Sequence, residues 1–285
     1  MPELIPVHHL PDAGRTMISV DRIEPRGAAV QNDVHRHDFH ELFVFATGTG
    51  EHMIDLEHVT LKPPCVHLVA PGQVHRLSRS ADCTGAAVMF GTDVMIEPTL
   101  PIDVKGLFRA AGNGQAFPID TDQLGEALHL IEEIEKGSNK GELPGVVRSY
   151  LNILLMKCAH WQGTSGSHRP GRTDHGDPVT RFTDLVELQF LAKRQVHAYA
   201  GDLAMTPGHL NELVKKRLGK SASEVVQDRL LLEAKRLLLH AELSVKEVSH
   251  ALRMEDPAYF NRVFKKATGM TPMEYRTHIR EKYQR

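Results

Sequence analysis

Short apolar runs separated by glycine, proline and aspartate characterise the chain from residue 15 to about residue 100. Three of these runs lie at residues 42–45, 66–69 and 86–90. Short apolar or alternating runs that are bounded by turn-forming residues are typical of β-strands. At this spacing they predict an antiparallel sandwich or barrel.

The apolar period becomes helical at Thr121. Apolar residues then recur at every third or fourth position over 121–136 and over 143–162, which predicts two amphipathic helices separated by the segment from Gly137 to Gly145. Residues 163–177 contain no apolar aliphatic or aromatic side chain and predict a flexible linker. Everything after Pro178 has helical periodicity.

An internal repeat with an offset of 50 residues is the most informative feature of this helical part. Each copy combines an N-cap residue, a proline at the first helical position, an apolar stripe, two lysines and a final glycine. The matching positions of the first copy are Thr206, Pro207, Leu210, Asn211, Lys215, Lys216, Gly219 and Glu224. Those of the second copy are Asp256, Pro257, Phe260, Asn261, Lys265, Lys266, Gly269 and Glu274.

A shorter predicted helix precedes each repeated helix, at 196–204 and at 245–252, so that each copy reads as a helix-turn-helix. A longer helix from Ala222 to about Leu239 joins the two copies. Three capping boxes mark further helix starts. They are formed by Ser221 with Glu224, Ser244 with Glu247, and Thr271 with Glu274.

Two such units placed about one helical turn of DNA apart would enter successive major grooves, because the second helix of the motif fits that groove. Asparagine can bind adenine and arginine can bind guanine through paired hydrogen bonds. The expected contacts of the first unit are Pro207, Gly208, His209, Asn211 and Glu212, and those of the second are Pro257, Ala258, Asn261 and Arg262. Lys215, Lys216, Lys265 and Lys266 are expected to bind phosphates.

The segment from Glu233 to Arg276 resembles the signature of the AraC/XylS family, above all over residues 256–276. The resemblance covers about residues 180–282 and implies a transcription factor with two helix-turn-helix subdomains joined by a long helix. In one position the chain departs from the family, since Arg253-Met254 stands where the family usually has Gly-Phe. A left-handed backbone at Arg253 would cost about 1 kcal/mol, and Met254 can still fill the core.

Histidines and a glutamate gather in the strand-forming part, where His35, His37 and Glu41 share parity on an extended strand and His40 points the other way. A turn at Pro71-Gly72 precedes a further histidine, His75. Three imidazoles and one carboxylate suit zinc, iron, manganese or nickel. The same side chains would also suit direct hydrogen bonding to an effector, or a purely structural role at the barrel mouth.

These residues, together with Gly48, are similar to the two sequence motifs of the cupin fold over about residues 20–100. The resemblance implies a small antiparallel β-barrel with a central pocket, of the kind that AraC-type regulators use as effector sensors. Phe39, Phe43, Phe45 and Arg76 are candidate pocket residues. In the resembled family, helices such as those at 121–136 and 143–162 often join two chains, so we expect a homodimer.

Charge is distributed unequally between the two halves. The whole chain has a net charge of −2, but residues 180–285 hold 19 Lys and Arg against 13 Asp and Glu, which leaves 15 against 23 for residues 1–179. A basic C-terminal part suits a polyanionic partner. The three cysteines form no paired motif, and neither a signal peptide nor a membrane-spanning run is evident, so we expect a cytoplasmic protein.

Together these features predict a multidomain α+β protein. A cupin-like sensor barrel at 1–118 precedes helices at 119–162, a linker at 163–177 and a DNA-binding domain at 178–285. The predicted function is a transcription regulator, not an enzyme, that binds an operator in double-stranded DNA under the control of a small-molecule effector, and that contacts RNA polymerase if it activates. Two alternatives remain: a metal-dependent cupin enzyme fused to a helical domain, and a regulator that senses the metal itself.

Overall fold

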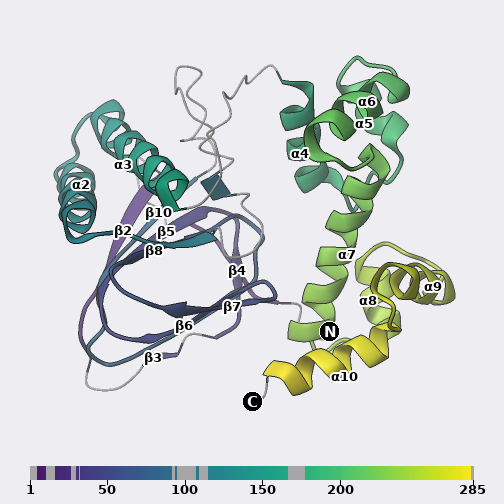
Figure 1. Ribbon diagram of the computed structural model, residues 1–285, viewed down its shortest axis with the longest axis horizontal. Helices are drawn as coiled ribbons and strands as arrows, with labels where there is room; N and C mark the ends of the chain where they lie inside the picture. The colour runs from purple at the N-terminus through teal and green to yellow at the C-terminus, as the bar shows by residue number, and fades with distance from the viewer. Residues whose placement is uncertain are drawn as a thin grey trace. The chain divides into compact units, whose positions relative to one another are not determined.

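The computed structural model describes residues 5–10, 17–26, 30–31, 33–91, 94, 107–108, 115–165 and 177–283. The chain divides into two compact units, one formed by residues 6–173 and the other by residues 174–285 together with residues 1–5. The predicted multidomain α+β class is confirmed: strands fill most of the first unit, and helices make up the described part of the second (Figure 1).

Two sheets face each other in the first unit. A five-stranded sheet has the order β11-β8-β5-β10-β2, and a four-stranded sheet has the order β3-β9-β6-β7. A parallel pair, β1 with β4, completes the set. The strands are β1 (Val7–His8), β2 (Ile18–Ile23), β3 (Val30–Gln31), β4 (Arg36–His37), β5 (His40–Thr47), β6 (Gly50–Ile54), β7 (Glu57–Leu61), β8 (Cys65–Val69), β9 (His75–Arg79), β10 (Thr84–Phe90) and β11 (Ala116–Pro118).

Alternation along the central strands gives each sheet two different faces. In β8 all five side chains are buried, because Cys65 and Val69 face the space between the sheets while Val66 and Leu68 face the helices outside. Apart from His67, the strand is apolar throughout, as expected for a strand covered on both faces.

Helices α2 (Thr121–Lys140) and α3 (Pro144–Ser165) cover the outer face of the five-stranded sheet. Ile131, Ile134, Leu151 and Leu155 are fully buried there, in one core with Leu42 and Val44 of β5. The apolar stripes of both helices therefore pack on the barrel of their own chain. Consequently the segments predicted as separate, 1–118 and 119–162, belong to one compact unit.

The boundaries of these two helices differ from the predicted ones. The first helix does not stop at Gly137; it continues to Lys140 and ends at Gly141, whose φ of 67° is left-handed. Gly137 serves close packing instead, since a Cβ there would lie 2.8 Å from Val147 Cγ2. The second helix continues to Ser165, so the predicted linker at 163–177 begins inside a helix, and residues 166–176 lie outside the described residues.

The C-terminal unit contains the two predicted helix-turn-helix copies. The first consists of α5 (Val196–Asp202) and α6 (Pro207–Leu218), the second of α8 (Val245–Ala251) and α9 (Pro257–Thr268). Helix α7 (Ala222–His240) joins them, and α4 (Pro178–Gln189) and α10 (Pro272–Tyr283) pack beside it. Figure 1 shows the two copies at opposite ends of α7.

The helix ends follow the sequence closely. Thr206 and Asp256 cap the two repeated helices, which both begin with proline and end at a left-handed glycine, Gly219 or Gly269. Hydrogen bonds in both directions confirm all three predicted capping boxes, at Ser221, Ser244 and Thr271.

Candidate functional site

The two repeated helices differ in what their exposed faces carry. On α6, Pro207, Gly208, His209 and Glu212 are exposed, whereas on α9 the exposed residues are Ala258, Tyr259 and Arg262, with Pro257 half-buried. Arg262 is 69% exposed and lies near Asp256, at 3.8 Å, and over the Tyr259 ring, 5.9 Å from its centroid. All four predicted phosphate-binding lysines are exposed at the ends of these helices.

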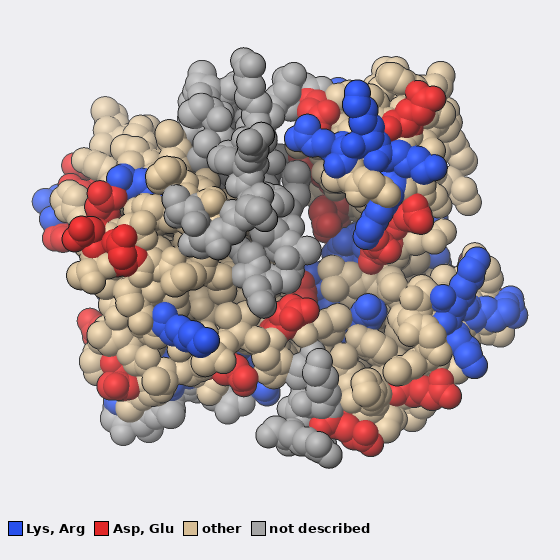
Figure 2. Space-filling view, viewed as in Figure 1, with Lys and Arg blue, Asp and Glu red and all other residues tan. Residues whose placement is uncertain are grey.

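Basic side chains of the C-terminal unit gather in separate places over the first and the second helix-turn-helix copy (Figure 2). This arrangement suits two contacts with a polyanion. Tyr259 was missing from the sequence-based candidates. Its position between Ala258 and Phe260, off the buried stripe of the helix, could have identified it as a candidate from the sequence.

Asn211 and Asn261 occupy equivalent positions but make different bonds. Both are half-buried. Asn211 Oδ1 accepts a hydrogen bond of 3.1 Å from the backbone N–H of Ala222 at the start of α7. The position equivalent to Ala222 is Pro272, which has no N–H, and Asn261 Nδ2 instead donates to the carbonyl oxygen of Pro257, at 2.9 Å. Asn211 thus fixes α6 against α7, and base contacts by either asparagine stay predictions.

In the turns before the repeated helices the two copies align with an offset of 49 residues. Ala204 and Arg253 both have a left-handed backbone, with φ values of 54° and 55°. Met254 is buried at 5% exposure, so it fills the core as the sequence indicated. The left-handed strain anticipated at Arg253 is therefore present.

At the other candidate site, three of the four predicted ligands come together. One ligand atom each from His37, Glu41 and His75 lies within 4.8 Å of the others. The Nε2 atom of His37 is 3.3 Å from Glu41 Oε2, and that of His75 is 3.8 Å from the same oxygen. Both ring nitrogens are buried without a hydrogen-bond partner.

The backbone between His37 and Glu41 is bent and not extended, because β4 ends at His37 and β5 begins at His40. At this bend His37 Nδ1 donates to the carbonyl oxygen of Phe39, at 2.7 Å, and the Phe39 ring stacks on the imidazole, 4.2 Å between centroids. A carbonyl can only accept, so His37 carries its proton on Nδ1 and turns Nε2 toward Glu41.

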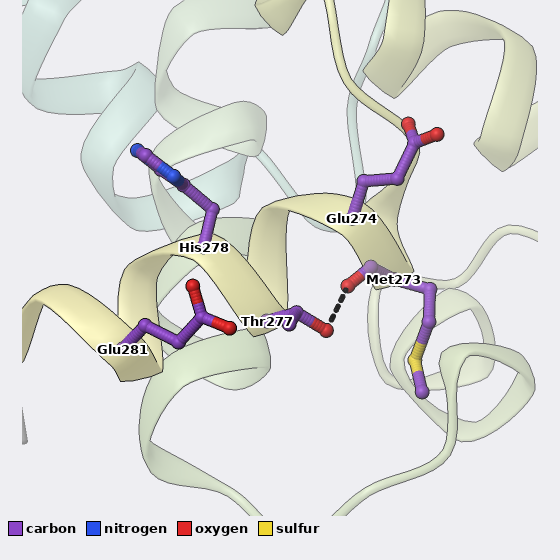
Figure 3. Close-up of a pocket in the computed structure, with 5 residues that line it drawn as sticks. All are labelled: Met273, Glu274, Thr277, His278 and Glu281. Atoms are coloured by element: carbon purple, nitrogen blue, oxygen red, sulfur yellow. Dashed lines mark hydrogen bonds between the residues drawn. The ribbon is translucent and has the colours of Figure 1, made fainter.

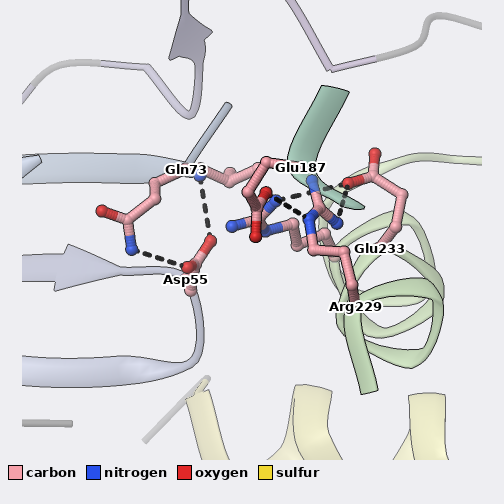
Figure 4. Close-up of polar contacts among 7 residues, drawn as sticks. Asp55, Gln73, Glu187, Arg229 and Glu233 are labelled. Atoms are coloured by element: carbon pink, nitrogen blue, oxygen red, sulfur yellow. Dashed lines mark hydrogen bonds and ion pairs between the residues drawn. The ribbon is translucent and has the colours of Figure 1, made fainter. Parts of the chain in front are cut away.

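The turn before His75 is held from both sides. Gly72, with a φ of 76°, donates its N–H to the carbonyl oxygen of His37, at 2.8 Å. Asp55 accepts from Gln73 Nε2 at 2.9 Å and from the backbone N–H of Val74 at 3.1 Å (Figure 4). This clamp fixes the entry to β9 and hence the position of His75.

His35 lies beside the group but outside it. It forms a backbone bridge to His75, its ring centroid is 4.2 Å from that of His75, and its Nδ1 donates to the carbonyl oxygen of Asp33 at 2.8 Å. His40 faces away, as predicted, and packs against Phe90 and Phe108.

The predicted pocket residues have different surroundings. Phe43 and Phe45 belong to the core between the two sheets, and Phe39 supports His37. On β9 buried and half-buried residues alternate, so Arg76 lies on the opposite face from His75 and Leu77. Among the described residues, the space between the sheets is thus filled by aliphatic, aromatic, cysteine and histidine side chains, and Arg76 does not face it.

Burial also controls the charge of the site. It holds the pKa of His75 well below its ordinary value, with further lowering by His52 and the other neighbouring histidines. Burial likewise lowers the pKa of His35. These rings are therefore neutral at neutral pH, which is the form in which histidine binds metal ions.

A recess on α10 is lined by the exposed residues Met273, Glu274, Thr277, His278 and Glu281 (Figure 3). All five project from a single helix, and Thr277 Oγ1 donates to the Met273 carbonyl oxygen at 3.2 Å. The recess brings no buried polar atoms together, and we assign no ligand to it.

Comparison with known proteins places both sites in one family. The AraC-like ligand binding domain family matches residues 18–93, and a helix-turn-helix domain family matches residues 199–278. The chain belongs to the AraC family. This AraC-family protein is a DNA-binding transcription regulator with an N-terminal ligand-binding domain, and not an enzyme.

Relatives of similar length support the assignment of this AraC-family chain. The transcriptional activator RhaS of Salmonella arizonae is 22% identical over 260 residues, which cover 89% of this chain and 91% of RhaS. RhaS of Escherichia coli O9:H4 is 20% identical over 265 residues, with the same coverage of both chains.

Among solved structures, ToxT from Vibrio cholerae O395 is 15% identical, with a TM-score of 0.42, and the match covers 92% of this chain and 97% of ToxT. The C-terminal domain of AraT from Geobacillus stearothermophilus is 27% identical, with a TM-score of 0.34, over 35% of this chain and 84% of that domain. Among the residues that the structure describes, no helix is long and apolar enough to cross a membrane.

Proposed function

We propose that this AraC-family regulator is controlled by the occupant of the group formed by His37, Glu41 and His75, and that the occupant is one divalent transition-metal ion. The ion would be the effector itself or would hold a small-molecule effector at its open positions. The observation that carries this proposal is the convergence of two orphaned, buried imidazole nitrogens on one carboxylate.

The donor set fits such an ion. Buried polar atoms normally have hydrogen-bond partners, so two unpartnered nitrogens at one point indicate a missing ligand. Two imidazoles and one carboxylate suit zinc, iron, manganese and nickel, and such a three-residue set leaves coordination positions open. His37 and His75 would ligate through Nε2 and Glu41 through its carboxylate, with His35 beside them as a candidate fourth ligand.

Binding at this group would act on DNA binding by shifting an equilibrium that already exists between competent and incompetent arrangements of the chain. The group lies where β1, β4, β5 and β9 meet, because His37 pairs with His8 in β1 and Gly72 binds the His37 carbonyl. An ion here would tie these segments together more firmly than hydrogen bonds alone.

For the DNA side, we propose that exposed residues at the start of α6 and α9 read base edges in successive major grooves. Arg262 and Tyr259 of the second unit and His209 of the first are the best placed by exposure. The lysine pairs at 215–216 and 265–266 would hold phosphates.

We propose in addition that two chains associate through α3. Val146 and Ile153 are 40% and 42% exposed on this helix, and Leu143 just before it is 76% exposed, although the opposite face of α3 is fully buried on the barrel. Because the relatives are named activators, we propose activation, with a contact to RNA polymerase, as the output.

Titration of the metal-free, full-length protein with Zn²⁺, Ni²⁺, Mn²⁺ and Fe²⁺, followed by calorimetry and elemental analysis, tests the proposed site. We expect one equivalent of at least one ion to bind, and binding to be lost in His37→Ala and in Glu41→Ala. The matched control is His58→Ala, a half-buried histidine on β7 outside the group. Equal binding by wild type and His37→Ala would contradict the assignment.

A further inference from the structure

A row of buried side chains leads from the proposed metal site into the barrel. His75 Nδ1 lies 3.1 Å from His52 Nε2, and His52 Nδ1 lies 3.2 Å from His67 Nδ1. His67 Nε2 in turn lies 3.6 Å from Cys65 Sγ. Three strands supply this row, β9, β6 and β8, and we call it the histidine row.

Every member of the histidine row is shielded from water. His52, His67 and His75 are 0%, 1% and 2% exposed, and Cys65 is 4% exposed. Aromatic rings enclose the two inner histidines, with Phe43 edge-on to His52 at 5.1 Å and Phe45 edge-on to His67 at 5.2 Å. Burial lowers the pKa of His67 to about 4 and raises that of Cys65 to about 11, so both are neutral near pH 7.

A neutral imidazole has one N–H donor and one acceptor nitrogen. In an unbroken row of such rings, the nitrogen that carries the hydrogen in the first ring therefore determines which nitrogen carries it in every other ring. Only two arrangements of the hydrogens satisfy all three contacts. In one arrangement the His75 Nε2 atom carries a lone pair toward Glu41 and His37. In the other arrangement the same atom carries a hydrogen.

Only the first arrangement would let His75 hold a metal ion through Nε2, because a ligating nitrogen must present its lone pair. The His75 Nδ1–H group then donates to His52 Nε2, and the His52 Nδ1–H group donates to His67 Nδ1. The His67 Nε2–H group donates to Cys65 Sγ at the far end. In this arrangement every contact within the row joins one donor to one acceptor.

We propose that His52 and His67 are positioning residues for the metal site, which hold His75 in the tautomer and orientation that direct its Nε2 lone pair to the ion. The proposal rests on the proposed function, since it requires a metal ion at His37, Glu41 and His75. It assigns a role to two buried histidines that lie in neither cupin-like sequence motif.

Three variants of His52 and His58 test the proposal in the full-length protein with Zn²⁺ as the probe. His52→Phe removes the acceptor for the His75 N–H group, and we expect Zn²⁺ affinity to fall about 10- to 100-fold, as is typical for partners behind a ligating histidine. His52→Gln keeps an acceptor oxygen and should restore most of the affinity. His58→Phe makes the same replacement outside the histidine row and should leave affinity unchanged.

Circular dichroism and thermal unfolding of the metal-free variants check that His52→Phe is folded. Nitrogen-15 NMR of the histidine rings gives a readout that is independent of affinity. In the Zn²⁺-loaded wild type we expect His75 to be protonated at Nδ1, His52 at Nδ1 and His67 at Nε2. A merely structural role for His52 would not fix this sequence of tautomers.

Two outcomes would overturn the proposal while the metal site stands. In one, His52→Phe binds Zn²⁺ as tightly as the wild type; in the other, the His75 ring of the loaded protein is not protonated at Nδ1. If the wild type binds none of the four ions, the metal site itself is wrong and the positioning role falls with it. Loss of Zn²⁺ binding in His37→Ala therefore shows that the metal site stands, so that an unchanged affinity in His52→Phe counts against the positioning role alone.

Discussion

Buried polar side chains of the barrel and of the C-terminal helices differ in how they are paired. In the helices, Glu233 lies on α7 between Arg229 and Arg236, each with a guanidinium nitrogen 3.3 Å from Glu233 Oε2. Arg229 also binds Glu187 of α4, at 2.6 Å (Figure 4). Its guanidinium group covers the Phe190 ring. In this cluster each charged side chain lies beside one of opposite charge, and the ion pair of Arg229 with Glu187 joins α7 to α4.

In the barrel, the buried ring nitrogens of His37 and His75 point at one carboxylate and have no hydrogen-bond partner. Other orphaned atoms exist among the described residues, such as Gln189 Oε1 and Asn152 Oδ1, but among those residues the converging group of metal-ligand atoms is that of His37, Glu41 and His75. A polar group that is paired within the fold thus supports structure, whereas orphaned groups that converge indicate a ligand.

The largest effect that this comparison predicts is on stability. Glu233→Ala would leave Arg229 and Arg236 buried without their shared partner, and removing one member of a buried ion pair costs about 3–5 kcal/mol. Urea unfolding followed by helical circular dichroism measures the change. The matched control is Glu187→Ala, which removes a carboxylate that is 59% exposed and should cost about 1 kcal/mol or less. Equal losses of unfolding free energy in the two variants would contradict the predicted difference between the buried and the exposed carboxylate.

Acid should affect the barrel before it affects the helices. Burial lowers the folded-state pKa of His67 from 6.5 to about 4, so the unfolded chain takes up the proton first. Stability is therefore fully present above pH 6.5 and is lost as the pH falls toward 4, by about 3 kcal/mol for this group.

The capping glutamates Glu224, Glu247 and Glu274 behave differently, because hydrogen bonds at the helix starts lower their pKa from 4.5. Their contribution is present above that pH and is lost only as the pH falls through the lowered value. The single tryptophan, Trp161, packs in the barrel–helix core and reports on the first unit. Its fluorescence transition should precede the loss of helical circular dichroism, and His67→Phe should move it to lower pH; coincident transitions would count against this order.

A third prediction concerns exposed charge, which we propose reads DNA and does not support the fold. Arg262→Ala should weaken binding to a selected operator by about 1–3 kcal/mol and leave stability unchanged, because this side chain is 69% exposed. Asn211→Ala should instead lower the free energy of unfolding by about 1 kcal/mol, because it removes the bond to the start of α7. Fluorescence anisotropy and urea unfolding separate the two effects, and unchanged operator affinity in Arg262→Ala would refute its role.

The smallest predicted effect tests the left-handed turn. Arg253 has a φ of 55°, so Arg253→Gly should stabilise the second helix-turn-helix by up to about 1 kcal/mol. Ala204→Gly provides the equivalent change in the first copy, where φ is 54°. Thermal unfolding of both variants should show small increases in Tm, and a decrease in both would mean that the left-handed turns carry no strain.

The repeat allowed much of the C-terminal fold to be predicted, because capping residues, prolines and glycines specify helix ends locally. Thr206, Gly219 and Ser221 act as their types indicate. The bond from Asn211 to Ala222 could not be predicted, since it depends on how α6 packs against α7. The same is true of Gly137, whose close approach to Val147 overrides its tendency to end a helix.

In the barrel, the two motif segments predicted which residues meet, and His37, Glu41 and His75 do meet. The prediction assumed that His37 and Glu41 share one face of a continuous strand. This reason was wrong, because the bend at residues 38–39 brings His37 toward Glu41. His52 and His67 could not be found from motifs, because β6 lies beside β9 through strand pairing within one sheet, and β8 lies near them only because the other sheet faces it.

Control of DNA binding by the metal site is tested most directly by the affinity of the full-length protein for a selected operator, measured by anisotropy with and without Zn²⁺ or whichever of the four ions binds. We expect the ion to change the affinity of the wild type, and we expect His37→Ala and His75→Ala to stop responding although they are folded and still bind DNA. An operator affinity that is the same with and without the bound ion in the wild type would contradict this control.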